Sequence, residues 1–430
     1  MTIRLRSLAA TLAASVLALV PASASAAGFA IFEQGARGMG FAGAFTAQAN
    51  DPSAIFHNAA GIGFLKGKQL YLGGTLIRPT SDFTGANPFP GAGVTEKGDV
   101  GLLVPPSAYY TQRFSDTLVL GVGFFTPFGL KTQWAEPDRY TGRYISQLAE
   151  LKGFSLNPTL AYKLADRLSV GVGVDVRFSS VTLQRRVPFV NPFTQKVVDV
   201  AEVRLESNTN TGVGFNLGLL AKPSESFSIG VAYRHKVKVD YDGSATFTKL
   251  STGNAQVDAL VAGALPAGGV GLTTGIEFPG LLSGGIAYTW NDWTIEGDVN
   301  WYQWSTFDQI DLTFEGLPNL DRTIVEDYKS SMQYRVGLER RLNDRWLVRG
   351  GYFFDESPAP VESVSPLLPD ASRHGICLGG TWQSGRVRVD AGSWYVISKE
   401  RSTEGMSRDR YDGTYKSKAV TFGLSLGYTF

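Results

Sequence analysis

Apolar and polar residues alternate at every second position along most of the chain after about residue 69. Between Leu168 and Phe178, for example, leucine, valine and phenylalanine occupy the even positions, and small or charged residues occupy the odd ones. This period of two predicts β-strands with one apolar face and one small or polar face. The pattern predicts fourteen strands, at residues 69–79, 107–114, 118–126, 154–164, 168–184, 209–222, 227–242, 273–289, 293–314, 333–342, 346–354, 374–382, 386–396 and 419–430.

The connections between these strands are alternately short and long. The short ones, such as Ala165-Asp166-Arg167 and Asn291-Asp292, have the residue types of tight turns. The long ones cover residues 80–106, 127–153, 185–208, 243–272, 315–332, 355–373 and 397–418. Short turns at one end and long loops at the other are typical of bacterial outer-membrane barrels. We therefore predict an all-β fold, a 14-stranded antiparallel transmembrane β-barrel whose apolar faces meet lipid.

The composition supports a membrane barrel and argues against other classes. The 50 glycines, 26 phenylalanines, 17 tyrosines and 8 tryptophans suit short strands, tight turns and aromatic girdles. The 40 basic and 39 acidic residues leave no basic excess, so we expect no nucleic-acid partner. His57, His235 and His374 occur in unrelated contexts, and the single cysteine, Cys377, lies in a predicted strand. We therefore expect no metal, no cofactor and no catalytic residues, and we do not expect an enzyme.

Both ends of the chain carry features of export to the outer membrane. Two arginines, an apolar run over 8–20 and Ala24-Ser25-Ala26 predict a secretory signal peptide that is cleaved between Ala26 and Ala27. The last predicted strand ends in Phe430, which we interpret as a signal for the barrel assembly machinery. An ordinary closing strand is the alternative. We expect a monomer, surrounded by outer-membrane lipids of a Gram-negative bacterium.

Residues 27–68 precede the first predicted strand and lack its alternation, because glycine and alanine recur throughout the segment. A segment of about 40 residues is too small to fold alone, so we expect it to lie inside the barrel as a small N-terminal hatch. A flexible periplasmic extension is the alternative that composition leaves open. The predicted organisation is a signal peptide over 1–26, the hatch over 27–68 and the barrel over 69–430.

Several short motifs occur in a fixed order along the chain. They are Ala27-Gly28-Phe29, Asp51-Pro52-Ser53-Ala54-Ile55-Phe56-His57-Asn58-Ala59-Ala60-Gly61, Thr126-Pro127-Phe128-Gly129-Leu130, Asn157-Pro158-Thr159-Leu160-Ala161-Tyr162-Lys163-Leu164, Tyr233-Arg234-His235-Lys236-Val237-Lys238-Val239, Asp355-Glu356-Ser357-Pro358-Ala359-Pro360 and the C-terminal strand. Their order and spacing resemble the FadL-type long-chain fatty-acid transporters, a family that also includes transporters of aromatic hydrocarbons. In the plug motif of this family a proline follows the asparagine, whereas here Ala59 follows Asn58. The backbone after Asn58 is then less constrained in φ.

The resemblance implies a plugged fourteen-stranded barrel with a ligand pocket in its lumen. It also implies an inward kink in the third strand that opens a side door to the outer leaflet. In this chain the kink maps to Gly121, Gly123 and Pro127, residue types that suit irregular pairing. A strand that simply ends at Pro127 is the alternative. On the matching positions we expect ligand contacts at Phe29, Ile31, Asn58, Phe125, Phe128, Phe189, Phe193, Leu260 and Val261.

Two of the long loops match those that form an apolar capture groove in the family. They cover residues 187–193 and 257–265, and the second has apolar residues at helical spacing. Such a stripe could bind an acyl chain or pack on the neighbouring loop. Charged residues that share the inward register of the strands could likewise bind a carboxylate or form a mutually neutralising network.

We hypothesise that a lipophile settles on the apolar loops, moves to a lumen pocket near Phe29 and leaves sideways into the membrane. The cargo implied by the resemblance is a long-chain fatty acid or another hydrophobic ligand. An uptake channel for aromatic hydrocarbons or other lipophiles is the first alternative. A general porin would need an open lumen, an outer-membrane lipase would need a nucleophile with a base, and an adhesin barrel would bind no lipid.

Overall fold

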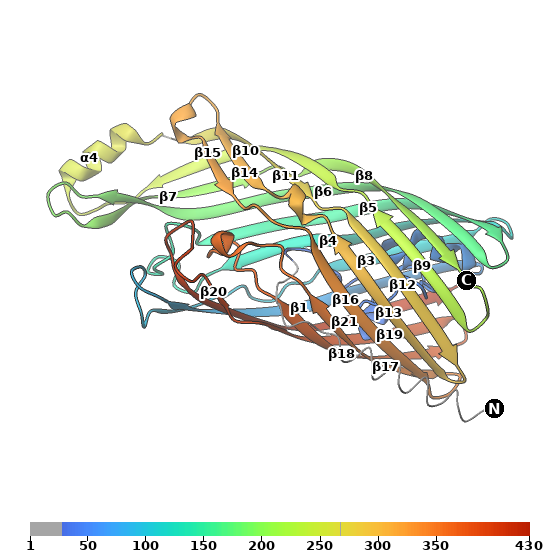
Figure 1. Cartoon of the computed structure of the whole chain (residues 1–430). Coiled ribbons are helices and arrows are strands. Elements are labelled where there is room, and N and C mark those ends of the chain that lie inside the picture. The colour runs from blue at the N-terminus through green and yellow to red at the C-terminus, as the bar shows by residue number, and fades with distance from the viewer. Residues whose placement is uncertain (1–27, 267) are drawn as a thin grey trace.

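The computed structural model describes residues 28–266 and 268–430, which form a closed antiparallel barrel (Figure 1). The fourteen predicted strands and the predicted fold class are confirmed. The first and last strands, β1 (Lys68–Gly85) and β21 (Gly413–Thr429), pair along their whole length and close the barrel. Closure leaves no free edge, so the strands satisfy each other's backbone hydrogen bonds within the membrane. The expected signal peptide and its cleavage between Ala26 and Ala27 lie outside the described residues.

Ten of the fourteen spanning strands, β1 among them, are single segments, and the other four are each split into two segments. The continuous ones after β1 are β3 (Pro106–Arg113), β4 (Leu118–Gln133), β5 (Leu148–Ala165), β6 (Leu168–Val190), β16 (Ser331–Arg341), β17 (Trp346–Asp355), β18 (Arg373–Ser384), β19 (Val387–Ser398) and β21. The split ones are β7 (Val197–Ser207) with β8 (Asn210–Ala221), β9 (Phe227–Arg234) with β10 (Val237–Lys249), β12 (Leu281–Trp290) with β11 (Gly269–Phe278), and β13 (Trp293–Tyr302) with β14 (Gln309–Phe314). Short strands β2 (Thr95–Lys97), β15 (Arg322–Val325) and β20 (Arg401–Ser402) belong to the long loops.

The splits and the strand ends differ from the prediction at the loop end of the barrel. The predicted strand 293–314 is interrupted by the 3-10 helix η2 (Trp304–Thr306), and 273–289 is interrupted at Pro279 and Gly280. The predicted loops 127–153, 185–208 and 243–272 were too long, because β4 to β7, β10 and β11 continue through them. The exposed positions of these extensions carry residues such as Lys152 and Thr246 instead of apolar side chains, so they lack the lipid-facing signal.

Exposed apolar side chains cover the outside of the barrel wall, as expected for contact with lipid. Exposed aromatic side chains bound this apolar surface near both strand ends. Those near the turns include Tyr162, Tyr288, Trp290, Trp346 and Tyr428, and those near the loops include Trp301, Tyr334, Tyr352 and Tyr395. Phe430 is also exposed at the turn end, where its backbone N–H donates to the Lys68 carbonyl. Among the helices of the described residues, none is long and apolar enough to span a membrane.

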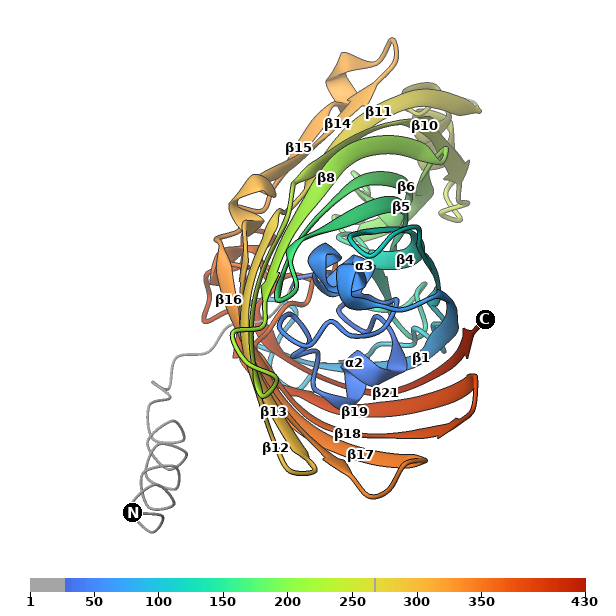
Figure 2. The same cartoon turned by 90° about the vertical axis from the view of Figure 1, so that its right-hand side faces the viewer.

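The N-terminal segment lies inside the barrel (Figure 2). It forms α2 (Ala36–Gly40), α3 (Ala54–His57) and the 3-10 helix η1 (Ala59–Phe64), and nearly all of its side chains are buried. Carboxylates of β13 hold its backbone. Asp298 accepts hydrogen bonds from the N–H groups of Phe45 and Thr46, both at 2.9 Å, and Glu296 accepts from Ala47 at 2.6 Å. These bonds satisfy backbone donors that no helix or strand pairs.

Candidate functional site

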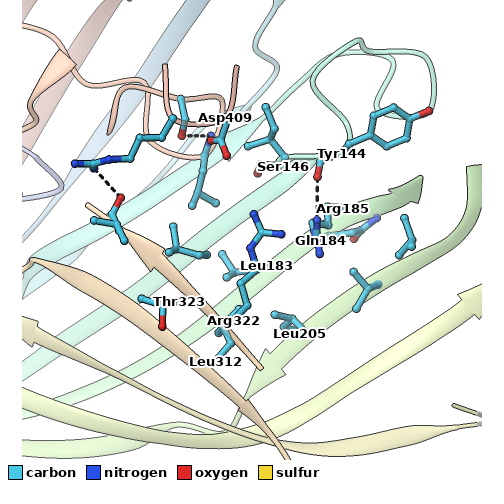
Figure 3. Close-up of a pocket in the computed structure, with 18 of the residues that line it drawn as sticks. Tyr144, Ser146, Leu183, Gln184, Arg185, Leu205, Leu312, Arg322, Thr323 and Asp409 are labelled. Atoms are coloured by element: carbon cyan, nitrogen blue, oxygen red, sulfur yellow. Dashed lines mark hydrogen bonds between the residues drawn. The ribbon is translucent and has the colours of Figure 1, made fainter. Parts of the chain in front are cut away.

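A cavity of about 370 Å³ opens at the loop end of the barrel (Figure 3). Its walls come from β5, β6, β7, β14, β15 and the loops before β18 and β21. Apolar side chains line most of it, among them Leu148, Leu183, Leu205, Leu312 and Phe314. We call this space the mouth cavity.

Charged groups gather on one part of the mouth cavity. Arg185 of β6, Arg322 of β15 and Asp409 all belong to its lining (Figure 3). Arg185 donates one hydrogen bond, at 3.1 Å, to the Tyr144 carbonyl oxygen. Within the described residues, the guanidinium groups of Arg185 and Arg322 have no carboxylate oxygen within 4.0 Å. Two arginines beside an apolar surface are suited to bind the head group of an anionic amphiphile.

Glu326 lies at the edge of the same cavity, in the loop between β15 and β16. Its side chain is buried. Burial and, to a smaller extent, the nearby carboxylates of Asp409, Asp370 and Asp327 together raise the pKa of Glu326 to about 8, against the lowering effect of Arg408. At neutral pH the Glu326 carboxyl is therefore protonated and adds no negative charge to the cavity.

A second, smaller cavity of about 50 Å³ lies deeper in the lumen. We call it the inner pocket. Leu183, Leu312 and Leu367 line both cavities, so the apolar surface is continuous from the mouth to the inner pocket. Phe29 stands at the inner end of this path. Its ring packs edge-on against Trp304 at 4.7 Å and Phe307 at 5.2 Å between centroids.

The N-terminal segment also contacts an irregular part of β4. Pairing between β4 and β5 shifts register between Phe125 and Phe128, at Thr126 and Pro127. Ala30 bridges to Phe128 on the other edge of β4, and the Ile31 N–H donates to the Pro127 carbonyl at 2.9 Å. β4 then continues to Gln133, so the strand does not end at Pro127.

On that same edge, β3 and β4 separate. Their register pairs run from Arg113↔Val119 to Ala108↔Phe124. Beyond Phe124, this edge of β4 bridges to Ala30 at Phe128 and then to Gly98 at Trp134. The residues Phe29 to Ile31 lie along the edge that β3 leaves. Gly121 and Gly123 keep regular pairing. Both glycines lie against Ile55 of α3, and a larger side chain at either position would displace Ile55.

The structure places the remaining predicted ligand residues in two other regions. Asn58 is buried where the N-terminal segment meets the wall: its Oδ1 accepts from the Ala60 N–H, and its Nδ2 donates to the carbonyls of Thr46 and Leu219. These bonds fix Asn58 without the proline that this chain lacks. Asn58 thus lies among the contacts of the segment and does not line the mouth cavity or the inner pocket.

The predicted loop residues lie on an arm that β6, β7 and α4 (Ala255–Ala264) form beyond the barrel wall (Figure 1). Val261 of α4 packs against Val200 of β7, with Phe189 beside them. Leu260 and Phe193 remain 56% and 58% exposed. The helical stripe therefore packs on the neighbouring strands and also leaves apolar side chains on the surface.

Sequence reasoning missed the residues that form the path itself. Leu183 was seen only as part of a strand, and Leu312 lies in the segment where the predicted strand 293–314 is broken. Arg185 and Arg322 lie in predicted long loops, where no periodicity marks them. The pairing of distant segments alone brings these side chains together, and a single sequence does not reveal it.

Charged residues of the inward face form buried pairs with one another. Asp175 binds Arg177 and Arg234, each at 2.9 Å, and Arg335 binds Asp355 at 2.9 Å. Arg234 also donates to the carbonyls of Ile55 and Phe56 in α3. Of the two roles that the sequence left open, the structure shows the neutralising network for these residues.

The fold and these cavities define a class of protein: an outer-membrane β-barrel with an apolar path through a plugged lumen. The chain matches the family described as outer membrane protein transport protein (OMPP1/FadL/TodX) over residues 17–430, and it belongs to this family. Members of the family are transporters of hydrophobic compounds in the outer membrane, which is the class and location of this chain. They are transporters or channels rather than enzymes.

Individual relatives agree with this assignment. The chain is 24% identical to the long-chain fatty acid transport protein of Escherichia coli O6:H1, with 97% of each chain covered. Among solved structures, a Pseudomonas aeruginosa FadL homologue has a TM-score of 0.82 at 22% identity and covers 94% of this chain and 100% of its own. The toluene transporter TodX of P. putida has a TM-score of 0.74 at 19% identity, with 92% and 98% covered. Both structures support the same fold.

Proposed function

We propose that this protein takes up amphipathic carboxylates, long-chain fatty acids first among them, across the outer membrane. The observation that carries the proposal is the continuous apolar path behind Arg185 and Arg322. The two guanidinium groups bind the carboxylate, and the acyl chain lies along Leu183 and Leu312. Each methylene that leaves water contributes about 0.8 kcal/mol, which favours a long chain over a short one.

In the proposed mechanism, the exposed side chains of Phe193 and Leu260 capture the lipid first. The chain then moves through the mouth cavity to the inner pocket at Phe29. From there it passes Phe128, which packs against Phe29, and then Ile31 and Phe125 beside the irregular part of β4. Movement of the segment at Phe29 to Ile31 uncovers the separated edges of β3 and β4, and the lipid leaves sideways at Pro127. No covalent step is needed.

This mechanism treats residues 27–68 as a movable hatch and 69–430 as the barrel that surrounds it. The burial of the segment and its bonds to Asp298 and Glu296 support this division. We also propose that the protein works as a monomer in contact with outer-membrane lipids, and that the barrel assembly machinery inserts it through a strand ending in Phe430.

Uptake of aromatic hydrocarbons is the second candidate. The apolar inner pocket, lined by side chains such as Ile276 and Phe307, favours it, because a small aromatic compound needs no charged partner. The two candidates differ in what they require of the arginines. A neutral hydrocarbon gains nothing from Arg185 and Arg322, whereas a carboxylate depends on them.

The double variant Arg185→Ala/Arg322→Ala tests this difference. We expect oleate binding about tenfold to a hundredfold weaker, because hydrogen bonds to a charged group contribute about 1.5 to 3 kcal/mol. Toluene uptake should be unchanged. Binding to the purified protein and uptake by a strain without its own transporter are the measurements. Arg139→Ala, an exposed arginine in a loop at the same end, is the matched control. Equal losses for oleate and toluene, or no loss for oleate, would contradict a carboxylate site.

Binding of a carboxylate should also depend on pH above neutrality. As the pH rises through about 8, the carboxyl of Glu326 loses its proton and places a negative charge beside the bound head group. We expect binding of monomeric decanoate to weaken between pH 7 and pH 9, measured by calorimetry at constant ionic strength. Glu326→Gln removes the titrating group, so its binding curve should be flat over this range. The same pH dependence in both proteins would exclude Glu326 as its cause.

A further inference from the structure

The barrel wall has a second unpaired region, on the side opposite to the edge between β3 and β4. β11 pairs with β14 only through Leu272↔Phe314 and Thr273↔Thr313, and pairing resumes between β12 and β13 at Leu281↔Tyr302. Between these points, residues 274–280 face residues 303–312. Two bonds cross the interval: the Gln303 N–H donates to the Gly280 carbonyl at 2.9 Å, and the Thr306 hydroxyl donates to the Glu277 carbonyl at 3.2 Å.

Cavities lie on both sides of this interval. On the lumen side, Thr274, Ile276, Ile310 and Leu312 line the inner pocket. On the outer side, an open depression of about 700 Å³ reaches the same two strands. Thr274 lines both spaces, and its hydroxyl is buried with no hydrogen-bond partner among the described residues. Only a thin layer of side chains therefore separates the inner pocket from the outside.

The rim of the outer depression is acidic. Its lining contains the carboxylates of Asp240, Asp242, Glu277, Asp308 and Asp311 but one lysine, Lys238. Lys238 is bound to Asp240 at 2.8 Å, and Glu277 is bound to Lys236 at 2.9 Å. A net negative rim repels an anionic lipid, whereas an uncharged molecule passes without this cost. The charge is opposite to that of the arginines in the mouth cavity.

The depression lies just beyond the apolar belt. On the neighbouring strands, Leu282 and Trp301 are exposed in the belt, and they form the second register pair below the interval. An aromatic residue such as Trp301 marks the boundary between hydrocarbon and head groups. Molecules that dissolve in the head-group layer of the outer leaflet thus have direct access to the interval.

We propose that the interval between β11 and β14 is a second side entrance, through which small uncharged lipophiles pass from the head-group layer into the inner pocket. This entrance rests on the proposed function, because the inner pocket must pass the molecule onward. It separates two cargo classes: carboxylates enter through the mouth cavity, and neutral lipophiles enter through the wall at Thr274.

Thr274→Trp fills the point where the two spaces meet. Thr246→Trp adds the same bulk to the exposed face of the neighbouring strand β10, away from both spaces. We expect Thr274→Trp to slow the initial uptake of toluene by about twofold or more, since pore width limits passage, and to leave oleate uptake unchanged. Thr246→Trp should affect neither. Heat-modifiable mobility on gels verifies that each barrel is folded. Unchanged toluene uptake in Thr274→Trp, or equal slowing of both compounds, would overturn the entrance.

A labelling experiment tests the entrance without transport. Cys377 is buried and lines neither space, so labelling of the Thr274→Cys and Leu183→Cys variants reports on the introduced cysteine. Leu183 lies on the path from the mouth cavity, beside Arg185. We expect the cysteine at position 274 to prefer a neutral maleimide over a sulfonated one, and the cysteine at 183 to show a weaker preference or the reverse. The same preference at both positions would mean that Thr274 is reached through the mouth, and the entrance would be wrong. Wild-type oleate uptake reports separately on the proposed function.

Discussion

The double variant Glu296→Ala/Asp298→Ala is expected to loosen the hatch and make the outer membrane permeable to large hydrophilic antibiotics. These two carboxylates accept hydrogen bonds from four consecutive backbone N–H groups, those of residues 45–48. Each backbone N–H left unpaired in the lumen costs about 1 to 3 kcal/mol. The summed cost of four such groups exceeds the free energy that a segment of this size can lose and still stay in place. Sensitivity of a producing strain to vancomycin, and conductance of the purified protein in planar bilayers, measure the effect.

Asn300 provides the matched control for this variant. It lies on the same strand and the same inward face as Asp298, and it is fully buried. Its side-chain amide has no hydrogen-bond partner among the described residues. Asn300→Ala should therefore leave permeability at the wild-type level. If vancomycin sensitivity and conductance are the same for the double variant and for Asn300→Ala, the carboxylates of β13 do not hold the hatch.

Asp175→Ala is expected to destabilise the barrel more than any other single charge removal described above. Asp175 is the shared partner of Arg177 and Arg234, and all three side chains are buried. Its loss leaves two buried cations beside each other, which costs about 3 to 5 kcal/mol. Because Arg234 also holds the carbonyls of α3, the hatch should loosen as well. Urea unfolding in detergent or lipid vesicles measures the change.

The effect of Asp175→Ala is judged against Asp240→Ala. Asp240 also pairs with a basic residue, Lys238 at 2.8 Å, but this pair is exposed outside the membrane belt. Exposed pairs contribute about 0 to 1 kcal/mol, because water and salt screen them. A similar midpoint of urea unfolding for the two variants would show that the buried network contributes no more to the stability of the barrel than a surface pair.

Alternation predicted the barrel because the membrane imposes it on every spanning strand. Residues such as Val172 and Val174 face lipid, so their neighbours must face the lumen. Where β10 and β11 leave the membrane, the outward residues become polar and the same rule no longer applies. Pro279 lacks the backbone N–H that a continuous strand needs, which accounts for the break between β11 and β12. The break at η2 accompanies the packing of Trp304 on Phe29, a contact that a single sequence does not reveal.

The candidate site was predicted in part. Phe29 lies at the inner end of the apolar path, where the resemblance places a ligand. Asn58 instead lies among bonds that join the hatch to the wall, because the polar groups of a buried asparagine must find partners. Arg185 of β6 and Arg322 of β15 are more than a hundred residues apart in the chain and fall in predicted loops, and their meeting depends on how β15 folds over the mouth. Periodicity carries no information about such pairings.

The seam between β1 and β21 constrains the order in which the protein is assembled. The hatch precedes β1 in the chain, and it is enclosed by a wall that closes only when Gln69 to Gly85 pair with Gly413 to Thr429. The hatch donates hydrogen bonds to Asp298 of β13 and to Ser425 of β21. Once β1 and β21 have paired, a segment held at both of these strands can no longer enter the barrel from outside. The N-terminal segment, which is synthesised first, must therefore be in position before the last strand, β21, pairs with β1, so that the barrel closes around it.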